Sequence, residues 1–184
     1  MEPQEVLTQL KNTSLFTEWK KENKQSFLSH FFSPIDFMNI PQQEPAWEIG
    51  FLNSQKKKVT VFFQNDTDGE FSHRAPENVF QEKDDIIEEL IFHNVKISFH
   101  QAIEAFTSHL KQEFPAVAVK QGFVILQSLQ GNTLWNISGI TSTFSVINLK
   151  LHAKTGKVLN LQQIEVVRKE KGDGKERKEG KKSS

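Results

Sequence analysis

The six histidines are the first side chains to examine, because imidazole binds metals and transfers protons near neutral pH. A helical zinc site needs two histidines four residues apart with a glutamate beside the first. No two histidines of this chain have that spacing, and the two in one expected helix are nine residues apart. The pattern favours surface or structural histidines, so neither a metal nor a cofactor is expected. The six are His30, His73, His93, His100, His109 and His152.

A second candidate is a short acidic turn. Asp66, Asp68 and Gly69 resemble part of a calcium-binding loop, in which closely spaced carboxylates hold the ion. Glu77 stands at the twelfth position, where such a loop places its last carboxylate. However, a proline interrupts the stretch and no paired helix is expected after residue 70. The pattern therefore favours an ordinary Asx turn.

Paired carboxylates at Asp84-Asp85 and Glu88-Glu89 could act as an acid and a base, but only inside a cleft. They fall on the outer face of a short helix expected over 84–92, so they are predicted to be solvated. The chain has no glycine-rich phosphate loop and no G-x-S-x-G sequence. No catalytic residue is expected, and the chain is predicted not to be an enzyme.

The composition supplies a core but few reactive groups. The 184 residues include 16 Phe, 3 Trp, no Tyr and no Cys. Without cysteine there is no disulfide, thiolate zinc site or cysteine nucleophile. The aromatic content excludes a wholly disordered chain. Trp47 and Trp135 could stack on a ligand, but their alternating strand positions predict core residues.

The charges balance overall, at 23 basic and 23 acidic side chains, but they are unevenly placed. Residues 168–184 carry eight Lys/Arg, four Asp/Glu and no hydrophobic side chain, which predicts a disordered charged tail. Its acidic residues favour a solvating role over binding to an anionic surface. The N-terminal residues lack a secretory signal, and no apolar run is long enough to cross a membrane. A soluble cytoplasmic protein with no membrane partner is expected.

Periodicity predicts the elements of the first half. The helical spacing of apolar residues over 3–23 is interrupted at Asn12-Thr13-Ser14, where Ser14 is predicted to cap a second helix. Alternating apolar residues then predict strands. These strands cover 26–33, 46–52 and 59–63, with a proline-containing loop over 34–45. For 26–33 a continuation of the preceding helix is the alternative.

The second half follows a similar order. Ser98 and Gln101 predict a capping box for a helix over 98–114, which Pro115 ends. An antiparallel meander follows, with a hairpin turn at Gln130-Gly131-Asn132. Its predicted strands are 119–129, 133–140, 144–152 and 157–167.

The two halves match each other in this order, and Trp47 and Trp135 stand at corresponding places. This predicts an α+β fold made of two copies of one unit, each a helix packed on an antiparallel sheet of three to four strands. One unit alone is small for a stable core, so the copies are expected to pair. The expected boundaries are repeat 1 at 1–70, a linker with a short helix at 71–94, repeat 2 at 95–167 and the tail at 168–184.

The second copy carries a more specific pattern. After Leu134-Trp-Asn-Ile-Ser and a further apolar strand, residues 152–158 read His-Ala-Lys-Thr-Gly-Lys-Val. With the preceding helix, residues 95–166 resemble the PepSY domain family, whose usual ending is Asp-Ala-x-Thr-Gly-x-Val. His152 stands where the Asp is usual, and the match is weaker over 3–70. The resemblance implies a cystatin-like unit and carries no catalytic residues.

The resemblance also implies a role, because PepSY units in the propeptides of secreted metallopeptidases are associated with inhibition or chaperoning. We expect a non-catalytic module that binds or inhibits a peptidase or another protein through a sheet face, an edge strand or the loop over 34–45. One alternative is a small-ligand carrier or enzyme with a pocket in the cystatin-like cone. Another is weak nucleic-acid association through the basic tail. A monomer or homodimer is expected.

Overall fold

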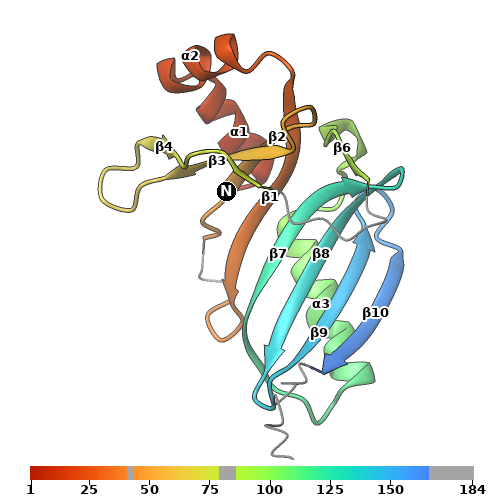
Figure 1. Ribbon diagram of the computed structural model, residues 1–184. Coiled ribbons are helices and arrows are strands. Elements are labelled where there is room, and N and C mark those ends of the chain that lie inside the picture. The colour runs from red at the N-terminus through yellow and green to blue at the C-terminus, as the bar shows by residue number, and fades with distance from the viewer. Residues whose placement is uncertain (41–43, 79–85, 166–184) are drawn as a thin grey trace, which may run out of the picture.

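In the computed structural model, which describes residues 1–40, 44–78 and 86–165, three helices pack on one face of a ten-stranded antiparallel sheet (Figure 1). The α+β fold class is therefore confirmed. The strand order is β10-β9-β8-β7-β1-β2-β3-β4, with β5 beside β3 and β6 beside β7. The elements are α1 (Pro3–Lys11), α2 (Ser14–Glu22), β1 (Ser26–Asp36), β2 (Glu48–Asn53), β3 (Lys58–Gln64), β4 (Phe71–His73), β5 (Glu77–Asn78), β6 (Ile87–Glu88), the 3-10 turn η1 (Phe92–Asn94), α3 (Phe99–Glu113), β7 (Val119–Leu129), β8 (Asn132–Thr141), β9 (Ser145–His152) and β10 (Val158–Glu165).

The N-terminal helix is broken where the sequence predicts, but its second cap lies one residue earlier. Thr13, and not Ser14, caps α2, because its hydroxyl accepts a hydrogen bond from the Phe16 backbone nitrogen at 3.1 Å. Glu2 and Glu5 form a capping box at the start of α1. The helix start is therefore fixed by side chains that bond to its free backbone groups.

β1 is longer than expected, because residues 34–36, assigned from the sequence to a loop, continue the strand. Pro34 lies opposite Phe123 of β7, whereas the pairing of β1 with β2 ends at Phe32. The missing N–H of proline therefore interrupts no bond to β2, and a proline is tolerated where a strand is paired on one side only. The loop expected over 34–45 begins after Asp36.

The short helix expected over 84–92 is not present in the described part of that range. Ile87 and Glu88 form a strand, β6, opposite Leu129 and Ser128 of β7. β1 pairs with β7 only as far as Gln127, so the last residues of β7 have a free edge that β6 occupies. This tertiary pairing overrides the local helical spacing. Residues 79–85 of the expected linker lie outside the described residues.

The second half agrees with the sequence almost element by element. Ser98 and Gln101 form the predicted capping box of α3. The strand predicted over 119–129 is present as β7, and the turn that follows has positive φ at Gln130 and Gly131. Such a two-residue turn matches the twist of a hairpin. β10 is described to Glu165, and the tail at 168–184 lies outside the described residues.

The strands of the two halves share one sheet. β1 of the first half pairs with β7 of the second, from Asp36 opposite Gln121 to His30 opposite Gln127. We call this β1–β7 pairing the seam. The expectation of two units, each with its own sheet of three to four strands, is not met, because the strands of both halves form one ten-stranded sheet. Among the described residues no helix is both long and apolar enough to span a bilayer.

Candidate functional site: the helix-free face of the sheet

The histidines do not gather into a site. Within the described ranges no group of three or more His, Asp or Glu side chains could hold a metal. His30 lies in β1, His152 at the end of β9, and His100 and His109 in α3. His73 lies in β4 and His93 in the η1 turn. The structure therefore brings together none of the candidates as a ligand set.

The acidic candidates do not gather at one place: Asp68 and Glu88 bond to nearby backbone, whereas Asp66 lines a hollow of about 400 Å³. The Asp68 carboxylate accepts a hydrogen bond from the Glu70 backbone nitrogen at 2.9 Å, which is an Asx turn. Glu77 pairs with Val59 in the sheet. Glu88 accepts a hydrogen bond from the Gly131 backbone nitrogen at 2.9 Å, so it braces the β7–β8 hairpin. Glu89 is exposed, and Asp84 and Asp85 lie outside the described residues.

Trp47 and Trp135 are core residues. Both are buried, and their rings lie 6.3 Å apart with Phe99 packed against each. The Trp47 indole nitrogen donates to the Met1 carbonyl, and the Trp135 nitrogen donates to the Ile97 carbonyl, both at 3.0 Å. Aromatic side chains therefore fill the space between the helices and the sheet, where a ligand would bind in a cystatin-like cone.

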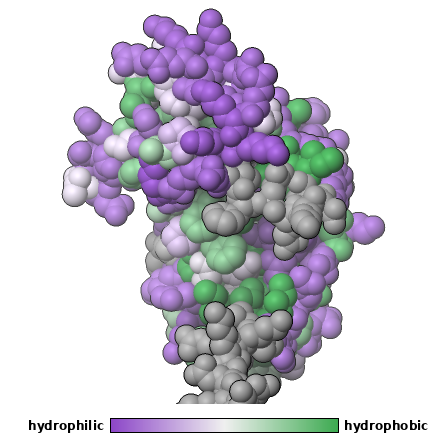
Figure 2. Space-filling view, in the orientation of Figure 1, coloured by the Kyte–Doolittle hydropathy of each residue, from purple (hydrophilic) through white to green (hydrophobic). Residues whose placement is uncertain are grey.

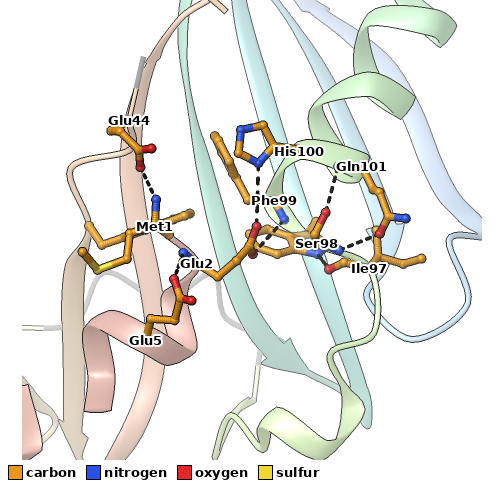
Figure 3. Close-up of polar contacts among 11 residues, drawn as sticks. Met1, Glu2, Glu5, Glu44, Ile97, Ser98, Phe99, His100 and Gln101 are labelled. Atoms are coloured by element: carbon orange, nitrogen blue, oxygen red, sulfur yellow. Dashed lines mark hydrogen bonds and ion pairs between the residues drawn. The ribbon is translucent and has the colours of Figure 1, made fainter. Parts of the chain in front are cut away.

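The starts of α1 and α3 meet beside these tryptophans (Figure 3). The Glu2 carboxylate accepts a hydrogen bond from the Phe99 backbone nitrogen at 3.1 Å, and its other oxygen lies 3.8 Å from His100 Nδ1. The Met1 nitrogen forms an ion pair with Glu44. Negative charge is favourable at a helix N-terminus. The polar groups of this junction bond to one another, so they join the helices and do not form an open site.

The face of the sheet away from the helices is different. We call it the open face, because no described helix covers it (Figure 1). Aromatic and aliphatic side chains alternate there with the buried residues of the core. Figure 2 shows hydrophobic residues in the middle of this face, bordered by hydrophilic ones. The half-buried residues that we call the apolar strip are Phe32, Val61, Phe63, Phe123 and Ile125.

The apolar strip is centred on the seam. Phe32 of β1 lies opposite Ile125 of β7, and its ring packs on the Phe123 ring with centroids 5.8 Å apart and planes tilted by 30°. Offset aromatic pairs of this kind are favourable. The seam therefore brings aromatic side chains from the two halves of the chain into contact.

An ion pair lies within the strip, because Glu48 of β2 lies opposite Phe32 of β1 and so stands between Phe32 and the strip residues of β3. The Arg74 guanidinium binds the Glu48 carboxylate with both terminal nitrogens, at 3.0 Å and 2.5 Å. Arg74 also lies over the Phe63 ring, 5.4 Å from its centroid. The Glu48 carboxylate raises the pKa of Arg74 above its usual value. This ion pair therefore separates Phe63 from the contact of Phe32 with Phe123.

His30 shares the open face and is neutral there. Its ring lies against Gly50 of β2, where a Cβ atom would come within 2.1 Å of the ring. Burial lowers the pKa of His30 to about 4, although Glu48 acts in the opposite direction. Ser29 Oγ lies 3.0 Å from His30 Nδ1. The open face therefore carries no charge at His30 at neutral pH.

Two hollows lie on this side of the molecule, and Pro34 lines the first of them. One, of about 400 Å³, is lined by Trp47, Glu48 and Phe63 among others. The other, of about 440 Å³, lies toward β8 between Met38 and Ile140. Apolar surface beside such hollows can accept side chains of a binding partner. The arrangement suits noncovalent binding.

The sequence contains one signal for this surface, the apolar residues on both faces of its strands. Apolar residues on both faces of a strand require both faces to be covered. A second copy is expected to supply that cover, but the strands of the two halves share one sheet through β1 and β7, and no described helix covers its second face. The members of the strip could not be named in advance, because long-range strand pairing determines which side chains adjoin.

Comparisons with known proteins leave the family open. No protein-family model matches the chain, and no curated protein matches its sequence. The structure is similar to the crystal structure of a Clostridium difficile 630 protein described as a "putative lipoprotein", with a TM-score of 0.49 and 13% sequence identity. That match covers 81% of this chain and 90% of the other.

Proposed function

We propose that this protein is a non-catalytic binding module of two PepSY-like units joined at the seam, and that its open face binds an extended segment of a partner protein. The observation that carries the proposal is the apolar strip, half-buried and uncovered by any described helix. Aromatic residues that stay partly exposed together on one surface are typical of protein-binding sites.

Three features support the origin from two copies of one unit. The strand order runs outward from the seam as β1-β2-β3-β4 on one side and β7-β8-β9-β10 on the other. A capping box begins α1 and α3 alike. In each half the tryptophan of the second strand region donates its indole N–H to the carbonyl just before the helix cap, Met1 or Ile97.

The chemistry of the strip indicates the kind of segment it binds. Phe32, Phe123 and Ile125 offer flat apolar contact, and neutral His30 adds no charge beside them. An extended segment places alternate side chains on one side. A partner segment with aliphatic or aromatic residues at alternate positions therefore fits, with side chains directed at the hollow lined by Pro34 and at the hollow between Met38 and Ile140.

The direct test selects random twelve-residue peptides displayed on phage against the full chain. Enriched peptides should carry alternating apolar residues and should lose at least about tenfold in affinity for the variant Phe123→Ser. Ile91→Ser is the matched control, because Ile91 is an exposed apolar residue outside the strip. Equal binding of the enriched peptides to both variants would exclude the open face as the site.

The resemblance implies inhibition of a metallopeptidase as one form of this function. The full chain should then slow a thermolysin-type peptidase, and Phe123→Ser should inhibit less than Ile91→Ser does. Equal inhibition by the two variants would place the inhibitory contact outside the strip. No inhibition by any of the three proteins would remove this form of the proposal.

A further inference from the structure

The sheet has two edge strands, and they differ in how well they are protected from pairing with another strand. At the N-terminal edge, β4 is only three residues long and is followed by Arg74. At the other edge, β10 has eight residues, and no described strand pairs with its outer side (Figure 1). An edge strand leaves a row of backbone N–H and C=O groups without a strand partner. β10 is therefore the longer template for a further strand.

β10 lacks the usual protection of an exposed edge. Natural edge strands carry lysine or proline, which hinders pairing with another chain. The sequence of β10 is Val-Leu-Asn-Leu-Gln-Gln-Ile-Glu, so it has no lysine, arginine or proline, and its one charge is at Glu165. Its register with β9 is irregular only between Val158 and Asn160. The stretch from Asn160 to Glu165 is therefore a regular and almost uncharged edge.

The apolar side chains of β10 are only partly covered by the fold. Leu161 packs against the core and lies opposite Leu149 of β9. Leu149 is fully buried, whereas Leu161 stays half-buried because the sheet ends beside it. Ile164 points to the opposite face and is 46% exposed. One more strand beside β10 would therefore bury apolar surface on both faces of the sheet.

We propose that β10 pairs with β10 of a second copy of this chain, antiparallel and with Gln162 opposite Gln162 of the second copy. In this register Asn160 lies opposite Ile164 of the second copy. Leu161 likewise lies opposite Gln163 of the second copy. Five consecutive residues of each strand pair, and all of them are uncharged. No charge therefore meets a like charge, and the segment is complementary to itself.

Other registers of the same two strands are less favourable. A shift by one residue would place opposing side chains on different faces. A shift by two in one direction would set the Glu165 carboxylate against half-buried Leu161. A shift by two in the other direction would bring in the irregular part near Val158. The uncharged and self-complementary stretch is what selects a second copy as the occupant of this edge.

The inference does not rest on the proposed function. No residue of β10 belongs to the apolar strip or lines either of the two hollows. Pairing at this edge adds a single strand contact, which is at the small end of protein interfaces. The dimer should therefore be weak, and its population should rise with protein concentration.

The test measures the dimer dissociation constant of the full chain by sedimentation equilibrium. The unchanged chain should dimerise as its concentration rises. Gln162→Lys should weaken the dimer about fivefold, because two like charges then lie opposite each other. Gln112→Lys is the matched control, because it makes the same change at an exposed residue of α3, and it should dimerise as the unchanged chain does.

A charge exchange tests the register itself. Gln162→Glu alone should also weaken the dimer about fivefold. A mixture of Gln162→Lys and Gln162→Glu should form a heterodimer about tenfold more stable than either homodimer, because opposite charges then face each other. Circular dichroism should show that every variant folds.

Three results would overturn the proposal. The first is an unchanged chain that stays monomeric at its highest soluble concentration. The second is a Gln162→Lys variant that dimerises as well as Gln112→Lys does. The third is a mixture of the lysine and glutamate variants whose heterodimer is no more stable than the homodimers, since residue 162 would then not face itself across the interface.

Discussion

The helix-covered face and the open face of the sheet use the same kinds of side chain under different constraints. On the covered face Trp135 is fully enclosed, and a hydrogen bond to Ile97 fixes its ring. On the open face Phe32 and Phe123 touch each other but stay half-buried. Aromatic residues at alternating positions therefore belong to the core on one face and to a binding surface on the other, and the strand partners decide which.

The largest expected effect is on the covered face. Trp135→Ala should lower the free energy of unfolding by about 3–5 kcal/mol, because it leaves a cavity and removes the bond to Ile97. Phe123→Ala on the open face should cost clearly less. Urea denaturation of both variants measures the difference, and equal costs would contradict the distinction between the faces.

The next largest expected effect is the pH dependence of the free energy of unfolding that His30 on the open face contributes. The pKa of His30 is about 4 in the folded protein and near 6.5 when unfolded. Between these values the unfolded chain binds more protons, so stability should be complete above pH 6.5 and fall by up to about 3 kcal/mol as pH decreases to 4.

Denaturation at a series of pH values measures this contribution, with NMR titration of the His30 ring beside it. His30→Gln should remove that part of the pH dependence. A His30 ring that titrates near 6.5 in the folded protein would show that it is solvated on the open face.

A smaller effect concerns the fit between His30 and Gly50. Gly50→Ala should cost about 1–3 kcal/mol, because the added methyl group occupies the space of the His30 ring. In a His30→Ala background the same change should cost much less. Additive costs in this double-mutant cycle would show that the position of the His30 ring does not require a glycine at residue 50.

The smallest effect is the contact across the seam. A double-mutant cycle of Phe32→Ala and Phe123→Ala should give a coupling of about 0.5–1.5 kcal/mol, as for other aromatic pairs. A coupling near zero would mean that the contact between these two rings does not stabilise the fold, unlike the aromatic contacts of the covered face. Equilibrium denaturation of the four proteins supplies the measurement.

Local features of the fold could be predicted from the sequence, because neighbouring residues determine them. The capping box of Ser98 with Gln101, the strand over 119–129 and the turn at Gln130-Gly131 are set by side chains close in sequence. The helix expected over 84–92 was wrong for a long-range reason, since Ile87 pairs with Leu129.

The candidate site was less predictable than the fold. The strip depends on Phe32 lying opposite Ile125, a pairing between the two halves that no local pattern encodes. The exposure of Phe144 likewise follows from the turn that holds it, because its residue type predicts a core position. Sequence periodicity identified the strands, while the structure was needed to say which face each side chain occupies.

The seam has a consequence for how the chain folds. The hairpins β7–β8 and β8–β9 join residues close in sequence, whereas β1 and β7 pair residues roughly ninety positions apart. Closing so long a loop costs entropy before any contact compensates for it. We therefore expect each half to gain its hairpins early and the seam to form in the slow, rate-limiting step. Until then β1 and β7 present unpaired edges, so the interval before they meet is when this chain is most exposed to pairing with another copy.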